Sequence, residues 1–207
     1  EASVKYEHVM TEGESGGLIV GERLSLVNLL KIMLITSSND AAEVIAEAVG
    51  SRVGGDNNIL KSSRDFFIEK MNEKAVQWGL NDTHFSTPTG LEDENNFSTV
   101  KNLANLAMKI FVAYPEIWRI SVMTTADVND STGLINHHLA NTNKLIPLFD
   151  DIVGSKTGYT EGAKGNIIII QQDPVKKDSI IYIIIGSNEK FSAVKSLIDW
   201  AHKAYLW

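Results

Sequence analysis

Apolar residues in the first part of the chain recur at helical spacing. A helix capped by Ser25 is expected over about Leu26–Ile35. Its apolar residues cover nearly every face, which predicts burial on all sides. The polar segment 36–39 interrupts the pattern before a second helix over about 40–49, and Gly50 suits the position after its last turn. The pattern therefore predicts two helices separated by a short polar loop.

Two more helices are expected before the pattern changes. Apolar residues at helical spacing predict a third helix over about 63–78, which Gly79 ends. A fourth helix is expected to start at Ser98 and to be limited by Pro115, because proline cannot continue a helix. The stretch 123–139 is ambiguous between helix and strand.

The last part of the chain has the short β-branched runs typical of strands. Such runs occur at 152–153, 167–170 and 180–185, and a polar turn that includes Pro174 predicts an antiparallel hairpin between the last two. An amphipathic helix is expected over 192–205, with Tyr205 among its inward residues.

Helices followed by an antiparallel sheet and a final helix predict an α+β architecture. The chain of 207 residues is interpreted as one partial domain, 1–207. Within it, a mainly helical lobe is expected over about 23–140, and a sheet with the C-terminal helix over about 150–207.

Composition excludes several classes of function. The net charge of -7 argues against nucleic acid as a partner, because phosphate binding needs a basic face. The absence of cysteine excludes disulfides, thiolate nucleophiles and cysteine-ligated metals. No apolar run is long enough to predict a membrane-spanning helix. We interpret the start at Glu1, without a signal peptide, as a processed or trimmed end.

No metal or cofactor site is predicted. The five histidines show neither an H-x-x-x-H nor an H-E-x-x-H pattern. His137 and His138 could be read as a metal pair, but adjacent residues on a strand point to opposite faces. The acidic run 92–94 could bind calcium, although a solvated loop is the preferred interpretation, and 13–17 does not match a phosphate-binding loop.

Two triplets carry candidate chemistry. Ser37-Ser38-Asn39 lies between two predicted helices, and Lys156-Thr157-Gly158 lies just before a predicted strand. Alone, the first could be a helix cap and the second a polar turn. Together they match the Ser-x-Asn and K-T-G motifs of serine acyl-transfer enzymes of the penicillin-binding and β-lactamase type.

The chemistry of that motif set is coherent. A serine hydroxyl needs an adjacent base, and a lysine can serve only where burial or nearby positive charge lowers its pKa. A second lysine supplies such a charge and attracts the substrate carboxylate. An asparagine amide can hold a peptide bond through its donor and acceptor together.

The chain resembles the low-molecular-mass penicillin-binding proteins that act as serine D-alanyl-D-alanine carboxypeptidases. The resemblance covers nearly all 207 residues. It implies a β-lactamase/transpeptidase-like fold, an antiparallel sheet packed with helices plus a helical lobe. The segments that carry it are Gly21–Ser25, Ser38–Ala42, Gly79–Leu80, Thr83–Phe85, Pro88–Leu91, Ser98–Thr99, Asn102–Ala104, Asn141–Asn143 and Gly154–Thr160.

The resemblance implies catalytic roles for three residues. Ser37 would be the proton-relay hydroxyl, and Asn39 would hold the substrate backbone. Lys156 would favour the terminal carboxylate of the substrate and help to depress the pKa of the catalytic lysine.

It implies substrate-binding roles for four more. Thr157 would donate a hydrogen bond to the carboxylate, and Gly158 would let the substrate approach the strand closely. The backbone N–H of Tyr159 would be one oxyanion-hole donor. Thr160 would line the rim, or else be an ordinary strand residue.

The S-x-x-K motif, which carries the family's nucleophile, is missing upstream of Ser37. Matches at Ser98, Ser187 and Ser192 lie downstream, in the wrong chain order, and we reject them; Ser98 and Ser192 are interpreted as helix N-caps. Truncation is the simplest account, with the first two strands and the nucleophile helix absent. Loss of these segments would leave an apolar groove. Either another segment fills the groove, or the chain pairs with a partner, or this chain is only part of what folds. The upstream gene sequence is predicted to encode S-x-x-K after a signal sequence.

The resemblance implies removal of the terminal D-alanine from peptidoglycan stem peptides through an acyl-enzyme, outside the cytoplasmic membrane, in the periplasm or cell wall. β-Lactams would be inhibitors, no cofactor or metal is implied, and any membrane contact would come from segments outside this chain. Without the nucleophile segment, this chain alone is expected to be inactive. The alternatives are a non-catalytic module that binds peptidoglycan peptides and a β-lactamase. Ser38 in the middle of the first motif, and Tyr159-Thr160 after the second, favour the carboxypeptidase over the β-lactamase.

Overall fold

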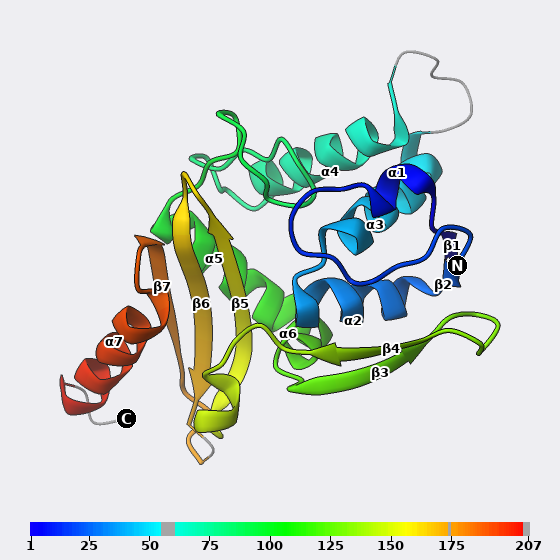
Figure 1. The fold of residues 1–207 in the computed structure, drawn as a ribbon. Helices are drawn as coiled ribbons and strands as arrows, with labels where there is room; N and C mark the ends of the chain where they lie inside the picture. Colours follow the sequence, from blue (N-terminus) through cyan, green and yellow to red (C-terminus); the bar gives the residue numbers. More distant parts are fainter. Residues whose placement is uncertain (55–60, 174, 205–207) are drawn as a thin grey trace. The chain divides into compact units, whose positions relative to one another are not determined.

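The computed structural model describes residues 1–54, 61–173 and 175–204 (Figure 1). The chain divides into two compact units: unit 1 comprises 1–98 and 125–140, and unit 2 comprises 99–124 and 141–207. Among the described residues, no helix combines the length and apolarity that crossing a membrane requires. The mixture of helices with antiparallel strands confirms the predicted α+β class.

Unit 1 is mainly helical. The helix α2 contacts α3 and the β3–β4 hairpin, and α3 packs against α4. The described elements of this unit are β1 (Ala2–Ser3), α1 (Tyr6–Val9), β2 (Arg23–Leu24), α2 (Leu26–Thr36), α3 (Asn39–Gly54), α4 (Ser63–Gln77), β3 (Thr125–Asn129) and β4 (Asn136–Ala140).

The start of α2 follows the prediction, but its burial does not. The Ser25 hydroxyl accepts a hydrogen bond from the backbone N–H of Asn28 at 3.1 Å, which caps the helix. Only one stripe of the helix is buried, and Val27 is 56% exposed. The prediction of burial on all sides was therefore wrong, because the contacts of α2 with α3 and the β3–β4 hairpin leave Val27 exposed.

The helix α3 continues past the glycine that was expected to end it. Gly50 lies inside α3, and a Cβ atom built there would lie 1.7 Å from the carbonyl oxygen of Ser63. Glycine is therefore present because the start of α4 approaches the backbone of α3 closely. The predicted helix end at Val49 was wrong for this reason.

The ambiguous stretch of the sequence folds as the β3–β4 hairpin. Burial alternates along β4, so His137 is buried and His138 is exposed. The two rings therefore point to opposite faces of the strand, as predicted. The Nε2 atom of His137 lies 2.5 Å from Oε1 of Glu22, and Oε2 of Glu22 accepts from the backbone N–H of Ile19 at 3.1 Å. This buried pair ties the hairpin to the turn before α2.

Unit 2 is a three-stranded antiparallel sheet between helices. The predicted strands and hairpin are confirmed, with the order β5-β6-β7. Pro174 and Tyr205, to which the sequence assigned a turn and an inward face, lie outside the described residues. The described elements are α5 (Val100–Ala113), α6 (Pro115–Ser121), the 3-10 helix η1 (Ile146–Leu148), β5 (Ile152–Thr160), β6 (Lys164–Gln172), β7 (Ser179–Ser187) and α7 (Lys190–Ala204).

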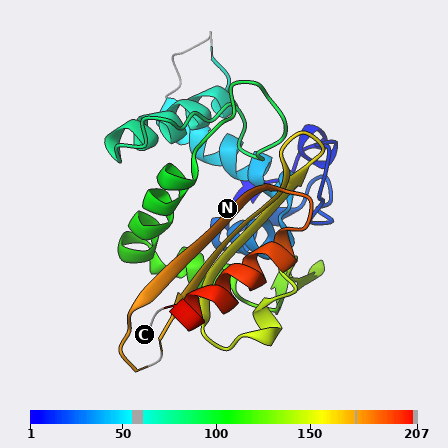
Figure 2. The same ribbon diagram turned by 90° about the vertical axis from the view of Figure 1, so that its left-hand side faces the viewer.

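Each face of this sheet is covered by helices. The helix α7 packs on the face that presents Ile167, Ile169 and Tyr182, and Figure 2 shows it running across the strands. On the other face, α5 and α6 pack against Ile170 and partly buried neighbours. Burial on both faces explains why 167–170 is an unbroken apolar run instead of an alternating one.

Helix starts in unit 2 differ from the prediction by one or two residues. The Thr99 hydroxyl, and not that of Ser98, accepts from the backbone N–H of Asn102 and caps α5. The helix α7 begins at Lys190, so Ser192 lies in its first turn and is not its N-cap. Pro115 ends one helix and also opens α6, where its fixed φ suits the first helical position.

Candidate functional site

The first motif lies in a sharp turn between α2 and α3. Ser37 has a φ of 61°, in the left-handed region that side chains other than glycine rarely adopt, and it reverses the chain direction. The buried Ser38 hydroxyl accepts from the backbone N–H of Ala41 at 2.9 Å and contacts the Asp40 carboxylate. The motif therefore also caps α3, so the two interpretations of this triplet are compatible.

A loop of the N-terminal segment passes over Asn39. The Nδ2 atom of Asn39 donates to the carbonyl oxygen of Glu12 at 2.7 Å, and its backbone N–H donates to the carbonyl oxygen of Glu14 at 2.7 Å. Gly13 has a φ of 90°, and a Cβ atom there would lie 2.4 Å from Nδ2 of Asn39. One of the two N–H groups of the Asn39 amide is therefore engaged by this loop, and the amide oxygen is suited to accept from a substrate N–H.

Asp40 fastens the same loop, a role that the sequence reasoning did not assign. Its buried carboxylate accepts from the Ser15 hydroxyl at 2.9 Å and from the backbone N–H of Gly16 at 2.9 and 3.1 Å. The position of Asp40 directly after the Ser-x-Asn motif was the only sign in the sequence that could have pointed to this role. Residues 12–16 thus form the wall of the first motif within unit 1.

The second motif lies on β5, where neighbouring segments hold it in place. Nζ of Lys156 donates to the carbonyl oxygen of Thr157 at 2.7 Å, and the Thr157 hydroxyl lies 2.8 Å from that of Thr142. One residue earlier, Ser155 is buried and its hydroxyl accepts from Nδ2 of Asn143 at 2.6 Å. The segment 141–143 therefore orients the hydroxyls that flank Lys156.

Lys190 is a further residue beside the motif that the sequence reasoning missed. Its Nζ donates to the carbonyl oxygen of Gly158 at 2.9 Å and lies 5.8 Å from the ring centroid of Tyr159. Burial lowers the pKa of Lys190 from its ordinary value. Lys190 comes from α7, far along the sequence, and places a second ammonium next to the motif strand.

The end of β5 is more open than its middle. A Cβ atom at Gly158 would meet only Cβ of Asn166, at 3.9 Å, so the strand backbone is accessible there. The Tyr159 side chain is exposed. The Thr160 hydroxyl accepts from the backbone N–H of Ala163 at 3.1 Å, which closes the β5–β6 turn. In this structure Thr160 has an ordinary turn-closing role.

The structure brings together the residues of each motif with their neighbours. Ser37, Ser38 and Asn39 lie in unit 1, with the loop 12–16. Lys156–Thr160 lie in unit 2, with 141–143 and Lys190. Each half is built by contacts within its own unit, and the convergence of the two halves remains a proposal.

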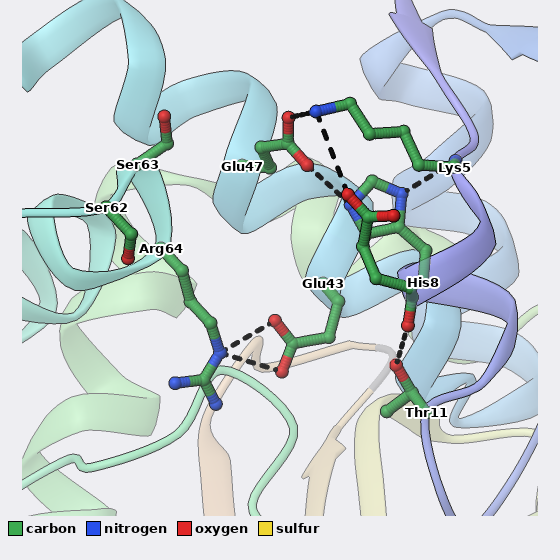
Figure 3. Close-up of a pocket in the computed structure, with 9 residues that line it drawn as sticks. Lys5, His8, Thr11, Glu43, Glu47, Ser62, Ser63 and Arg64 are labelled. Carbon is green, nitrogen blue, oxygen red and sulfur yellow. Dashed lines mark hydrogen bonds and ion pairs between the residues drawn. The ribbon is translucent and has the colours of Figure 1, made fainter.

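A separate pocket in unit 1 contains no motif residue. It has a volume of about 550 Å³ and lies between α1, α3 and the start of α4 (Figure 3). Nε2 of His8 lies 2.7 Å from Oε2 of Glu47, and Nε of Arg64 donates to both oxygens of Glu43 at 2.9 and 3.1 Å. Burial would raise the pKa of Glu47, but hydrogen bonds from Lys5 and His8 hold it below its ordinary value. The charged groups of this pocket thus satisfy one another.

The described residues contain no group of three or more histidine, cysteine, aspartate or glutamate side chains arranged to hold a metal ion. The side chains of the two motifs offer hydroxyls, an amide and an ammonium group. In the second motif, the ammonium of Lys156 and the hydroxyl of Thr157 are suited to binding a carboxylate. In the first motif, the Asn39 amide beside the Ser37 hydroxyl is suited to binding a peptide bond.

Comparison with known proteins identifies the family. The model of the D-alanyl-D-alanine carboxypeptidase peptidases matches residues 5–188. The chain belongs to this family. The D-alanyl-D-alanine carboxypeptidase DacF of Bacillus subtilis is 28% identical over 201 residues, covering 96% of the chain and 48% of the relative. A D-alanyl-D-alanine endopeptidase of Haemophilus influenzae is 34% identical over 175 residues, covering 84% of the chain and 54% of the relative.

Solved structures of D-alanyl-D-alanine carboxypeptidases share the fold. The enzyme from Mycobacterium tuberculosis superposes with a TM-score of 0.79 at 23% identity, covering 97% of this chain and 73% of that one. DacD from Francisella tularensis superposes with a TM-score of 0.80 at 20% identity, covering 97% of this chain and 57% of DacD. Family members are serine-type enzymes, and the chain spans about half the length of the curated relatives it matches.

Proposed function

We propose that this chain supplies the substrate-binding part of a serine D,D-carboxypeptidase that removes the terminal D-alanine from peptidoglycan stem peptides. The observation that carries the proposal is the occurrence of Ser37-Ser38-Asn39 and Lys156-Thr157-Gly158, in that order, inside the family match over residues 5–188. Such enzymes act on the cell wall, so the site of action is outside the cytoplasmic membrane, and β-lactams are inhibitors.

In this proposal the second motif binds the end of the substrate. The ammonium of Lys156 attracts the terminal carboxylate, and the Thr157 hydroxyl donates a hydrogen bond to it. The backbone N–H of Tyr159 stabilises the oxyanion, a contribution of about 3 kcal/mol in comparable sites. Lys190 holds the carbonyl oxygen of Gly158 and so orients the peptide unit that carries this N–H.

The first motif faces the scissile bond in the same proposal. The amide oxygen of Asn39 accepts from a backbone N–H of the substrate, while one of its two N–H groups donates to the carbonyl oxygen of Glu12. Ser37 relays a proton between the catalytic lysine and the leaving amine. The nucleophile and that lysine belong to an S-x-x-K motif, and no such motif precedes Ser37 in this sequence. We therefore propose that the 207-residue chain alone binds stem peptides without forming an acyl-enzyme.

Introduced cysteines test whether the two motifs meet. The chain has no cysteine, so Ser37→Cys combined with Lys156→Cys creates its only thiol pair. A short bis-maleimide is expected to join them, detected by mass spectrometry of the linked peptides. In the control pair, Lys176→Cys in the β6–β7 turn replaces Lys156→Cys, and no link is expected. Failure to link the first pair in a folded protein would contradict the shared site.

Fluorescent penicillin tests the catalytic part of the proposal. We expect no covalent label on the 207-residue chain after denaturing electrophoresis, because no S-x-x-K motif precedes Ser37 in this sequence. Labelling that Ser37→Ala abolishes would show that the acylation depends on Ser37, and it would contradict the proposal that this chain alone forms no acyl-enzyme. Rapid hydrolysis of nitrocefin by the chain would instead favour a β-lactamase.

A further inference from the structure

A small group of polar side chains lies in the apolar layer beneath α7 in unit 2. Gln171 of β6 is fully buried, and Tyr182 of β7 is 3% exposed. Asp151 is only partly buried; it lies one residue before β5, and its backbone carbonyl oxygen accepts from the N–H of Gln172 at 3.0 Å. Polar atoms buried as deeply as those of Gln171 and Tyr182 normally have hydrogen-bond partners, so the partners of these two side chains need an account.

The strand register brings Gln171 and Tyr182 to the same face of the sheet. Tyr182 is opposite Ile169, and Ile180 is opposite Gln171. Residues directly opposite each other share a face, so Tyr182 and Gln171 are diagonal neighbours. Tyr182 belongs to the buried cluster that includes Val194 and other α7 residues, which shows that this is the face α7 covers.

Two atoms of the group lack a partner among the described residues. Nε2 of Gln171 donates to Oδ1 of Asp151 at 3.0 Å, which leaves Oε1 of Gln171 as a buried acceptor without a donor. The Tyr182 hydroxyl is also buried without a partner there. Burial, and then the negative charge of Asp151, raise the pKa of Tyr182 to about 12.

The chemistry of these atoms specifies what can satisfy them together. Oε1 of Gln171 and the carboxylate of Asp151 only accept hydrogen bonds, whereas the Tyr182 hydroxyl can also donate one. A ligand that completes the set needs two donor hydrogens and one acceptor lone pair. A metal cation or an ammonium ion offers no acceptor for the Tyr182 proton. A water molecule meets all three requirements.

We propose that Tyr182, Gln171 and Asp151 form an internal binding site for one water molecule. The water donates to Oε1 of Gln171 and to Asp151, and it accepts from the Tyr182 hydroxyl. It connects β6 and β7 with the residue that precedes β5, the strand that carries Lys156. The site thereby helps to fix the end of the strand from which the second motif extends.

Tyr182→Phe distinguishes a water-bridged hydroxyl from an unsatisfied one by the sign of its effect. Loss of a bridging hydrogen bond is expected to lower the Tm of the chain by about 2–4 °C in differential scanning calorimetry. Removal of an unsatisfied buried hydroxyl would raise the Tm, and that result would overturn the proposal. Tyr6→Phe, at a side chain that is 66% exposed, is the control and should leave the Tm unchanged.

A crystal structure of the chain provides the second test. Density for a water within hydrogen-bond distance of the Tyr182 hydroxyl, Oε1 of Gln171 and the Asp151 carboxylate is expected. The same water should be weakened or lost in Tyr182→Phe. A direct hydrogen bond between the Tyr182 hydroxyl and Asp151, or a refined ion at the position, would overturn the proposal even if the Tm falls.

Discussion

Replacing Lys156 by Gln is expected to weaken the binding of an N-acylated peptide ending in D-alanyl-D-alanine by about 10- to 100-fold. A hydrogen bond to a charged group contributes about 1.5–3 kcal/mol, which corresponds to that range of Kd. Lys156 is partly buried on β5, so its charge is less screened than that of a surface lysine. Isothermal titration calorimetry on the 207-residue chain measures the change in Kd.

The control for this substitution removes the same charge elsewhere in unit 2. Lys176→Gln lies in the exposed β6–β7 turn, and it should change the Kd by less than about twofold, since exposed charges contribute little. Lys156→Arg keeps the charge but replaces the compact ammonium by a planar guanidinium, and it should recover only part of the affinity. Equal affinity of the wild type and Lys156→Gln would remove this residue from the binding site.

Replacing Glu22 by Ala is expected to lower the free energy of unfolding by about 3–5 kcal/mol. The Glu22 side chain is fully buried, and its two oxygens accept from Nε2 of His137 and from the backbone N–H of Ile19. Removing one member of a buried pair leaves the other without its partner in the interior. Urea denaturation followed by circular dichroism measures the change, through the midpoint at constant m-value.

A second pair on the same hairpin gives a matched comparison. Nδ1 of His138 lies 3.0 Å from Oδ1 of Asp127, and the two side chains are 69% and 67% exposed. Asp127→Ala should therefore lower the free energy of unfolding by less than about 1 kcal/mol, because exposed ion pairs contribute little to stability. Similar losses from Glu22→Ala and Asp127→Ala would show that burial does not govern the contribution of the first pair.

Helix ends show where local sequence rules hold and where they stop. The Ser25 cap depends on a hydrogen bond to a residue three positions away, so it could be read from the sequence. Gly50 satisfied the same kind of rule for a helix end and lies inside α3, because the contact that requires glycine comes from Ser63. A local pattern carries no information about which distant backbone will approach.

The candidate site divides in the same way. Its two motifs are contiguous in sequence, so their residues could be named from the sequence together with the family resemblance. The hydrogen bond from the Asn39 amide to Glu12 and the placement of Lys190 against Gly158 depend on segments separated by 27 and 32 positions. The sequence contained these residues, but it had no pattern that paired them.

By itself, the sequence determined the α+β class, the three strands and the final helix of unit 2, and the two motifs, because apolar periodicity and short polar triplets act over a few neighbouring residues. Only the tertiary structure decided which face of α2 is buried, how the loop 12–16 covers Asn39, and which polar groups share the layer beneath α7. These features depend on surfaces brought together by folding, and the free energy of burying a side chain is set by whatever packs against it.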